Sequence, residues 1–324
     1  MLNYCKLKMK KIIILTAIIL SIMISNLNAD KYAGEIFQMG AGVRNFALGN
    51  CGVSDVGSFG FAYWNAALLN EVKENRFELL HAEEYMGLLT YDTFSAIWGK
   101  DQKLSLVLTR IGIDDIPLTK LTDPEQPLSF QNRPYKYKSV NNSDLVLYLG
   151  IARKVGKYNL GFTPKLAYRN LAEESGFGFG ADLSAYFRIR QNCLLGVKIR
   201  DFFTTRILWA NGTHEFVNPS FDIEANYSFL LPFFKSDAKI FLRMEIFTEG
   251  RKEAASVSLK PLSMDPHLGM LLVINNYVDV LLGYDIDNLT SGILLQYKKW
   301  MINYGIELDT ELENSHRLSL GYIL

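Results

Sequence analysis

Cysteine, histidine and proline are scarce in this sequence, and neither sign of charge prevails. The 324 residues include three cysteines, four histidines and nine prolines, with 34 basic and 34 acidic side chains. The histidines His81, His214, His267 and His316 have neither i, i+4 spacing nor a cysteine cluster, so the pattern of a zinc site is missing. Balanced charge gives no basic surface for nucleic acid. We therefore expect neither a metal nor a nucleic-acid partner.

Enzyme motifs are missing as well. "GAGVRN", from Gly40 to Asn45, starts like the dinucleotide-binding pattern G-x-G-x-x-G, but Asn45 occupies the position of the third glycine and no strand precedes the run. The chain has no G-x-S-x-G segment and no recognisable catalytic triad. These absences predict a protein that is not an enzyme and uses no cofactor.

Long apolar runs are absent except near the N-terminus. Four lysines between residues 6 and 11 precede an uncharged run from Ile12 to Ile24, and Ala29 offers a small residue for cleavage. This pattern predicts a secretory signal peptide over residues 1–29; a retained anchor is the alternative. The residue directly after the cleavage site is Asp30 and not cysteine, which argues against a lipoprotein. Cleavage would remove four lysines and no acid, leaving 30 bases against 34 acids, a formal charge of −4.

The rest of the chain contains no run of roughly 18 apolar residues, so a membrane location would require a barrel. Cys51 and Cys193 remain after cleavage, and we expect both to be unpaired, because two thiols so far apart in sequence support no disulfide.

From about residue 75 onward, apolar and polar residues alternate. In "GFGFGADLSAYFRI", one face is wholly apolar, whereas the other carries glycines and polar residues such as Asp182 and Ser184. A soluble sandwich also alternates. However, its strands average about 5–6 residues, whereas these runs are longer and many end in Tyr or Trp, as in an aromatic girdle. The pattern therefore predicts an all-β, transmembrane antiparallel barrel over residues 75–324, in the outer membrane of a Gram-negative-type bacterium and in contact with its lipid.

The connections support this fold. Short turns alternate strictly with longer polar connections, as they must if one set lies in the periplasm and the other outside. With a first hairpin over Arg76–Glu84 and Leu88–Gly99, the count is about 14 strands. Pro164 predicts a bulge or loosely paired strand. The longer connections, expected outside, are Asp114–Asn142, Ala172–Ser175, Thr204–Asn218, Glu249–Pro266, Asp287–Ser291 and Asp309–Asn314.

The last strand runs to the carboxyl end. Leu318, Leu320, Tyr322 and Leu324 share one face of "HRLSLGYIL". Such a strand resembles the signal by which barrel-insertion machinery recognises its clients, although those usually finish on Phe. We expect that machinery to be a partner of this strand.

Residues 30–74 precede the barrel and lack strand periodicity. Leaving the aromatic and aliphatic side chains of this segment in water would be unfavourable by roughly 1.5–3 kcal/mol each. A barrel of this size leaves a lumen wider than its own side chains fill. The segment is therefore predicted to be a plug inside the barrel, with Arg44 pairing with lumenal acids such as Asp182 or Glu224.

The two ends of the chain together resemble a known family. "GEIFQMGAGVRNFALGNCGVSDVGSFGFAYWNAALL" and the C-terminal "HRLSLGYIL" resemble the PorV/PorQ family of outer-membrane proteins, within the broader FadL-like barrels. The middle of the chain resembles it only in strand rhythm. Ala66 replaces a usual Pro, and Asn50 stands where a second Gly is common. The residues that match the plug motif of the family are Gly40, Gly42, Arg44, Gly49, Gly52, Trp64, Asn65, Ala67 and Leu68.

This resemblance implies a non-enzymatic barrel that binds or helps to export partner proteins: secreted cargo or secretion-machinery proteins of the type IX pathway. The connections Asp114–Asn142 and Thr204–Asn218 would then be contact surfaces. The FadL-like resemblance implies an alternative, a channel for small hydrophobic molecules that opens when the plug shifts. A structural barrel or passive pore is the third possibility.

Overall fold

The computed structural model describes residues 33–232, 236–251, 255–259, 261–309 and 313–324. The predicted signal peptide, residues 1–29, lies outside them. Within the described ranges, no helix is long and apolar enough to cross a bilayer.

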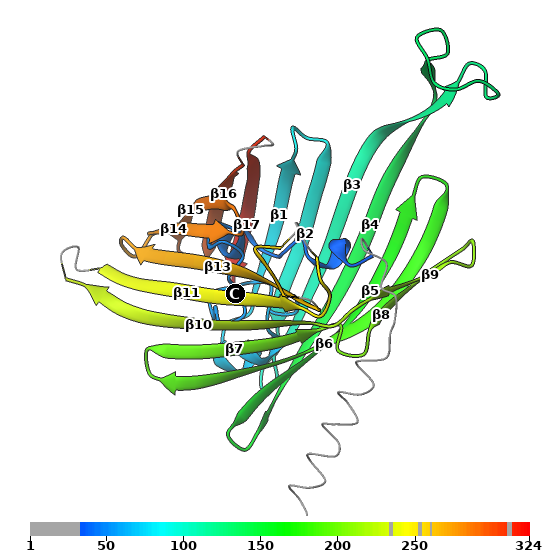
Figure 1. The fold of residues 1–324 in the computed structure, drawn as a ribbon. Coiled ribbons are helices and arrows are strands. Elements are labelled where there is room, and N and C mark those ends of the chain that lie inside the picture. Colours follow the sequence, from blue (N-terminus) through cyan, green and yellow to red (C-terminus); the bar gives the residue numbers. More distant parts are fainter. Residues whose placement is uncertain (1–32, 233–235, 252–254, 260, 310–312) are drawn as a thin grey trace, which may run out of the picture.

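The described strands form a closed antiparallel barrel of 14 strands, as predicted (Figure 1). The ring closes where β1 pairs with β17, from Arg76 opposite Ile323 to Glu83 opposite His316. The strands of the ring are β1 (Arg76–Glu84), β2 (Leu89–Trp98), β3 (Leu104–Leu121), β4 (Pro134–Val155), β5 (Tyr158–Leu171), β6 (Glu174–Arg190), β7 (Cys193–Arg200), β10 (Ser220–Leu231), β11 (Ser236–Phe247), β13 (Leu262–Val273), β14 (Val278–Asp285), β15 (Asn288–Tyr297), β16 (Trp300–Leu308) and β17 (Ser315–Ile323).

Three further strands lie within two of the connections that were expected to be loops. β8 (Thr205–Trp209) and β9 (His214–Val217) form a hairpin that pairs with β6, inside the expected loop Thr204–Asn218. β12 (Val257–Leu259) pairs with β13, which itself begins at Leu262. The expected loop Glu249–Pro266 was therefore too long, because part of it forms paired strands.

The expected loop Asp114–Asn142 is also mostly strand. β3 and β4 continue as a two-stranded arm, paired from Ile116 opposite Val140 to Leu121 opposite Pro134, beyond the end of β5 (Figure 1). At its base, Asp115 has a φ of 57° and its N–H donates to the side chain of Asn141. The segment was predicted to be a loop because it contains four prolines, Pro117, Pro124, Pro127 and Pro134. Pro117 and Pro134 lie in an edge ribbon, which tolerates the loss of a donor.

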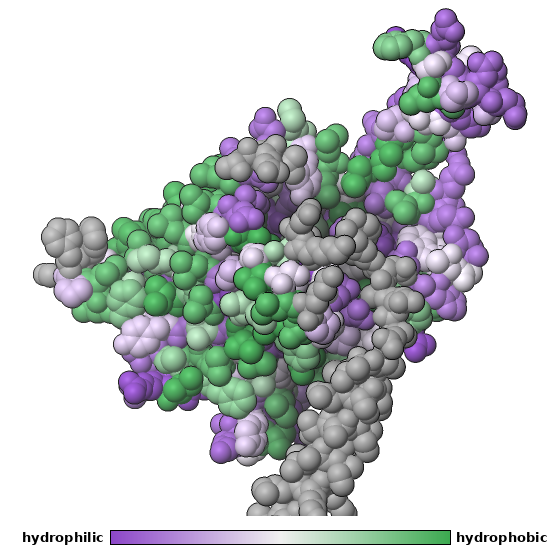
Figure 2. All heavy atoms as spheres, in the orientation of Figure 1, coloured by the Kyte–Doolittle hydropathy of each residue, from purple (hydrophilic) through white to green (hydrophobic). Residues whose placement is uncertain are grey.

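The two faces of the wall are as the alternation predicts. On β6, Phe177 is 48% exposed and Ile189 60%, whereas the intervening Asp182 is only 2% exposed. The outer surface of the wall is mainly apolar, and hydrophilic side chains gather on the arm (Figure 2). Pro164 pairs with Ala181 of β6 but interrupts the pairing of β5 with β4 between Phe162 and Lys165. The loose pairing predicted from this proline is therefore present between β5 and β4 but not between β5 and β6.

Residues 33–74, which precede β1, lie inside the ring (Figure 1). They form three short helices, η1 (Glu35–Phe37), α2 (Val43–Ala47) and η2 (Ala66–Glu71). α2 packs against β14, β15, β16 and β17, and η2 against β3, β4, β5 and β6, so the two helices touch different parts of the wall. We call residues 33–74 the N-terminal segment.

Leu183 tests the outward face. It lies near the middle of β6 and is 37% exposed. We expect Leu183→Arg to lower the free energy of unfolding by about 2–4 kcal/mol, the cost of a charge on the lipid face near the bilayer midplane. Denaturant unfolding from lipid vesicles measures it. Thr119→Arg on the exposed arm is the control and should change stability little; equal losses would contradict the assigned lipid face.

Candidate functional site

The N-terminal segment is held to the inner wall by a carboxylate of β10. The backbone N–H groups of Gly52 and Val53 donate to Oε2 of Glu224 at 2.8 and 2.9 Å. The N–H and hydroxyl of Ser54 donate to its Oε1 at 2.8 and 2.7 Å. Glu224 is fully buried. One carboxylate thus satisfies three consecutive main-chain donors that the surrounding segment cannot pair itself.

The wall approaches the segment through glycines. A Cβ added to Gly196 of β7 would overlap the carbonyl of Val53, and one on Gly283 of β14 would overlap the backbone nitrogen of Gly49. At Gly269 of β13 the carbonyl oxygen of Leu48 would lie 2.6 Å away. Side chains at these positions would force the backbones apart. The alternation in the sequence places these glycines on the inner face, but it does not show what they face.

Arg44 pairs within the segment. Its Nε lies 2.7 Å from Oδ2 of Asp55, and its Nη1 lies 3.9 Å from Asp279 of β14. Asn45 donates to the same Asp55 carboxylate at 3.3 Å. The predicted pairing of Arg44 with Asp182 or Glu224 is therefore wrong. Asp55 lies only 11 residues along the chain, and the turn between them brings the two side chains together.

The Asp55 carboxyl stays ionised in this setting. Burial opposes its ionisation, but the charge and hydrogen bonds of the Arg44 guanidinium outweigh burial, so the pKa of Asp55 lies below its ordinary value. The pair therefore contributes its full stabilisation above about pH 4, the ordinary carboxyl pKa, and loses it only in more acidic solution.

Trp64 fills the middle of the segment. Its indole N–H donates to the carbonyl of Ala41 at 2.7 Å. A Cβ on Gly52 would overlap the indole ring, so this glycine leaves room for Trp64. The guanidinium of Arg243, from β11, lies 5.4 Å from the centre of the ring, within the range of a cation–π interaction.

Asn65 caps η2 and ties it to the wall. Its Oδ1 accepts from the N–H of Ala67 at 3.1 Å, as an N-cap does, and its Nδ2 donates to Val53 and, at 3.1 Å, to Ala185 of β6. Ala67 and Leu68 are fully buried in η2. The sequence motif is thus a capped turn of helix against the inner wall.

The remaining motif glycines lie at bends. Gly40 and Gly42 both have a φ of 84°, and Gly49 has 63°. Asn50, where the family pattern has a second glycine, also has a positive φ, 58°, and its side chain donates to Asp285 of β14. Asparagine tolerates this region because its amide bonds locally, so the departure from the family pattern preserves the backbone bend.

Charged side chains surround the segment in linked pairs. Asp182 lies 2.9 Å from both Lys165 and Lys198, and Asp222 lies 2.7 Å from Arg200 and 2.6 Å from Arg243. These charges are almost completely buried. Asp201 lies 2.7 Å from Lys165 and Glu245 lies 2.6 Å from Arg243, so four carboxylates face four cations. Buried charges need such partners, and this part of the inner wall is therefore polar and balanced.

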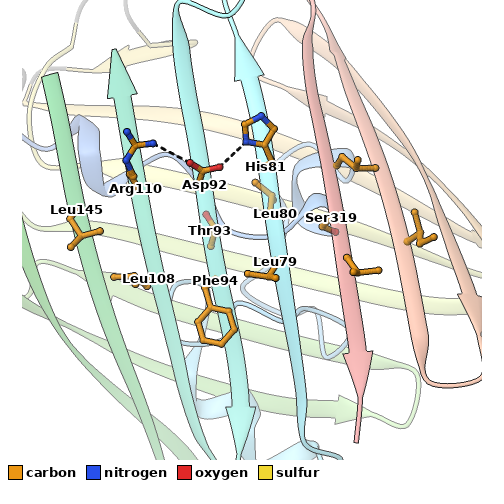
Figure 3. Close-up of a pocket in the computed structure, with 13 residues that line it drawn as sticks. Leu79, Leu80, His81, Asp92, Thr93, Phe94, Leu108, Arg110, Leu145 and Ser319 are labelled. Carbon is orange, nitrogen blue, oxygen red and sulfur yellow. Dashed lines mark hydrogen bonds and ion pairs between the residues drawn. The ribbon is translucent and has the colours of Figure 1, made fainter. Parts of the chain in front are cut away.

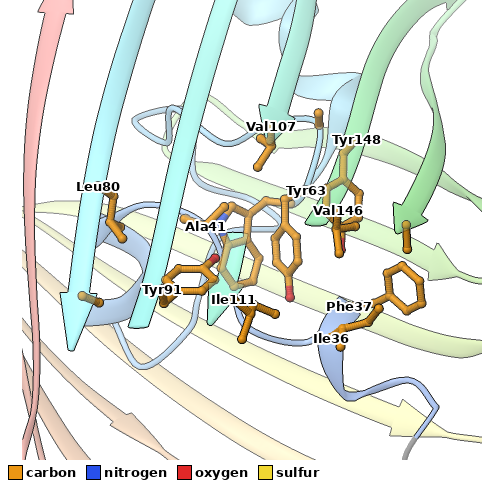
Figure 4. Packing of buried hydrophobic residues seen from close by; sticks show 14 of the residues in the cluster. Ile36, Phe37, Ala41, Tyr63, Leu80, Tyr91, Val107, Ile111, Val146 and Tyr148 are labelled. Carbon is orange, nitrogen blue, oxygen red and sulfur yellow. Dashed lines mark hydrogen bonds between the residues drawn. The ribbon is translucent and has the colours of Figure 1, made fainter. Parts of the chain in front are cut away.

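An apolar cluster lies beside these charges: the Lys198 ammonium is 5.2 Å and the Arg200 guanidinium 4.9 Å from the centre of the Tyr63 ring. Tyr63 of the segment stacks edge-on against Tyr148 of β4, with ring centres 5.4 Å apart, and lies among Tyr91, Ile111 and Phe37 (Figure 4). The hydroxyl of Tyr91 donates to the carbonyl of Gly40 at 2.5 Å. Sequence analysis predicted that the large side chains of the segment are buried in the lumen, but it did not identify their partners Tyr91, Ile111 and Tyr148 on the wall.

The outer wall carries a shallow groove of about 700 Å³ across β1, β2 and β3 (Figure 3). Leu79, Phe94 and Leu108 line its apolar floor. At one end, Asp92 lies 2.7 Å from His81 and 3.3 Å from Arg110. These polar side chains point outward and mark the end of the apolar band on these strands.

The last strand lies beside the first. Leu318 and Leu320 of β17 face outward, 55% and 43% exposed, and the ring of Tyr322 packs against Trp300. Leu324 follows the end of β17, 62% exposed, and its N–H donates to the carbonyl of Asn75. These residues form part of the outer wall at the seam that closes the barrel.

Both cysteines among the described residues, Cys51 and Cys193, are unpaired, as predicted. Cys51 is completely buried in the segment, and burial raises the pKa of its thiol well above the usual value. Cys51 is therefore unreactive while the segment is packed. In the described part of the chain, no group of three or more suitable side chains could hold a metal ion.

Comparison with known proteins identifies the fold. No family model matches the chain, and no curated protein matches its sequence. Among solved structures, the toluene transporter TodX of P. putida aligns with a TM-score of 0.53 at 13% identity, over 88% of this chain and 97% of its own. The toluene transporter TbuX of Ralstonia pickettii aligns with 0.54 at 10% identity, over 88% and 98%. The CymD monoaromatic hydrocarbon channel aligns with 0.52 at 10% identity, over 88% and 97%.

At such identities the similarity is one of fold. The chain has the fold of the FadL-like barrels, which its sequence resembles.

Glu224→Gln tests the hold on the segment. An amide has one acceptor oxygen and no charge, and hydrogen bonds to a charged group contribute about 1.5–3 kcal/mol, so we expect Cys51 to react with a maleimide about tenfold faster or more. The Cys193→Ser background isolates this thiol. Glu174→Gln, at the exposed start of β6, is the control. Unchanged labelling, together with unchanged protease resistance of the segment, would count against the role of Glu224.

Asp55→Asn tests the internal pair. It leaves the buried Arg44 without its nearest carboxylate, which typically costs about 3–5 kcal/mol. We expect residues near 44 to become susceptible to protease while the barrel itself stays folded, as seen by gel mobility without boiling. Glu173→Gln breaks the exposed pair with Lys138, and such surface pairs contribute little to stability because water and salt screen them. Similar effects of both substitutions would rule out a special role for Asp55.

Proposed function

We propose that this protein is an outer-membrane channel for small hydrophobic molecules, closed by its N-terminal segment acting as a plug. The proposal rests on the closed FadL-like barrel, whose fold aligns over 88% of the chain with the two toluene transporters. It reverses the order of the functions that the sequence implied, because the PorV/PorQ resemblance lies only in the two ends of the chain.

The proposed orientation places the short turns in the periplasm and the β3–β4 arm outside the cell. In this orientation the N-terminal segment joins β1 at the periplasmic end, where Asn75 accepts from Lys103 beside the β2–β3 turn. The outward aromatic residues Trp98 and Tyr158 would lie at the periplasmic interface, where such side chains gather.

If the segment moves to open the barrel, its hydrogen bonds to the wall would be replaced by hydrogen bonds to water. The hold of Glu224 on Gly52, Val53 and Ser54 consists of hydrogen bonds, and their net contribution is modest because water competes for both partners. The buried pairs of the inner wall, such as Arg200 with Asp222, lie within the wall itself. They would therefore persist when the segment moves. The apolar cluster around Tyr91 and Tyr148 would then be the part of the wall offered to a hydrophobic molecule.

A second candidate function, favoured by the β3–β4 arm, is the binding of partner proteins, as in the PorV/PorQ family and type IX secretion. The tip of the arm exposes Leu128 by 70% and Phe130 by 88%. The side chain of Asn132, buried beneath, donates to the carbonyls of Asp123 and Gln126 at 2.8 and 2.9 Å and fixes the loop. A rigid loop presenting apolar side chains to water is a feature of contact sites, and a channel does not need one.

Uptake by whole cells tests the first candidate. We expect a host with an intact outer membrane to take up radiolabelled toluene faster when it makes this protein, and faster still with Glu224→Gln, because the plug is held less tightly. Raffinose, a polar sugar, controls for a nonspecific leak, and Glu174→Gln for the substitution. The channel would be refuted if Cys51 labelling shows that the segment is released but toluene uptake is no faster than in cells that lack the protein.

The same cells separate the two candidates. Proteins that co-purify with the unaltered chain and are lost with Phe130→Ser, but not with Gln131→Ala, would favour partner binding.

A further inference from the structure

A cleft of about 620 Å³ opens at the short-turn end of the barrel. Its walls are the end of the N-terminal segment, the β2–β3 turn and the end of β4. On its inner side it borders Leu69 and Ala152, which belong to the apolar packing between segment and wall. Neither proposed function uses the cleft.

The cleft is strongly basic. Five of its lining side chains are cationic and one, Asp101, is anionic; the cations are Lys73, Lys100, Lys103, Arg153 and Lys154. The Lys103 ammonium donates to Asn75 and to the carbonyl of Gly99, at 2.6 and 2.7 Å, and so belongs to the structure of the rim.

The other four cations have no hydrogen-bond or ion-pair partner among the described residues. The nearby Glu71 cannot neutralise them, because it is bound to Arg188 at 2.6 Å and to the Tyr186 hydroxyl. The like charges around one cavity repel each other, and an anion in the cleft would relieve that repulsion. This contrasts with the lumen, where the carboxylates and cations are paired.

The cleft lies at the edge of the apolar band. Trp98, at the end of β2, faces outward and is 41% exposed, and Lys100 follows it by two residues. Ile151 of β4 also faces outward, 42% exposed, and Arg153 follows it by two residues. Aromatic side chains at the end of a barrel wall lie at the level of lipid headgroups. The basic side chains are therefore at the depth of the phosphates.

We propose that this cleft binds the phosphate headgroup of an anionic phospholipid from the adjoining leaflet. The Arg153 guanidinium offers a fork of donors that fits phosphate oxygens, and the ammonium groups of Lys73, Lys100 and Lys154 add charge. The acyl chains lie against the apolar wall beside Trp98 and Ile151. A soluble phosphate meets the same cations but gains nothing from this wall, which is why a lipid is the better ligand.

The bound lipid also joins the segment to the wall. Lys73 lies at the end of the N-terminal segment, whereas Lys100 and Arg153 belong to the barrel. A headgroup that contacts both binds only while this end of the segment is in place, so by mass action it favours that position. This consequence does not depend on what, if anything, passes through the barrel.

Native mass spectrometry of the purified full chain in detergent tests the proposal. The probes are short-chain phosphatidylglycerol, the matching phosphatidylcholine and inorganic phosphate. We expect phosphatidylglycerol to bind most tightly, and Lys100→Gln with Arg153→Gln to weaken it about tenfold or more, since each basic residue near a membrane surface contributes appreciably to anionic-lipid binding.

The matched control is Lys298→Gln with Lys299→Gln. These lysines lie in the β15–β16 turn and do not line the cleft. Their loss should leave phosphatidylglycerol binding unchanged. Unboiled gel mobility verifies that both double variants form barrels. Phosphatidylglycerol should protect the chain near Lys73 from protease more than phosphatidylcholine does. This protection should be lost in the cleft double variant and kept in the control double variant.

Three results would overturn the proposal. Equal binding of the two lipids would remove the role of the negative charge. Equal weakening by both pairs of substitutions would show a general attraction to basic turns. Inorganic phosphate that binds as tightly as phosphatidylglycerol would make the site one for a soluble anion. None of these results bears on hydrocarbon uptake, so this proposal and the proposed channel can fail separately.

Discussion

The structure depends on one constraint: every backbone N–H and C=O in the wall must find a partner within the wall, because hydrocarbon offers none. Pairing of β1 with β17 meets this constraint by leaving no free edge. Closure has a cost, however. A ring of this circumference encloses more space than its inward side chains fill, and the lumen must be occupied or wet. The N-terminal segment occupies it, and its large side chains Phe46, Phe61 and Trp64 are buried there.

The segment is itself irregular and carries backbone groups that need partners. The wall supplies them from positions far away in the chain. Glu224 accepts from three N–H groups some 170 residues earlier, and Thr290 exchanges hydrogen bonds with Ala47 and Gly49. Where a side chain would intrude, as at Gly196 and Gly283, the wall has none. The inner wall is thus a template for one backbone path, built from polar contacts that can break one by one. This suits a part that moves, which is what a gated channel requires.

The two ends of the barrel differ in the same physical terms. At one end β3 and β4 outgrow their neighbours and carry an arm whose tip exposes Leu128 and Phe130. At the other end the turns are short, and unpaired cations of the β2–β3 turn and the end of β4 surround a cleft. Apolar side chains exposed to water favour a contact with protein, whereas unpaired cations at headgroup depth favour a contact with lipid. The barrel between them has the fold of the FadL-like barrels.

The sequence by itself determined the wall. A period of two with one apolar face is a local property, so the outward residues of β6 and the even strand number could be predicted. The strict alternation of short and longer connections does not hold, because only two residues join β5 to β6 and β14 to β15. The sequence also identified Trp64 and Asn65 as members of one motif, because they are adjacent. Only the tertiary structure decided which groups meet inside. Arg44 pairs with Asp55 and not with Asp182 or Glu224, and the arm is a ribbon and not a loop. Both depend on register and on how a segment without periodicity turns in space. Arg44 and Asp55 are only 11 residues apart, but no helical or strand period relates them, so no local pattern predicts that they meet.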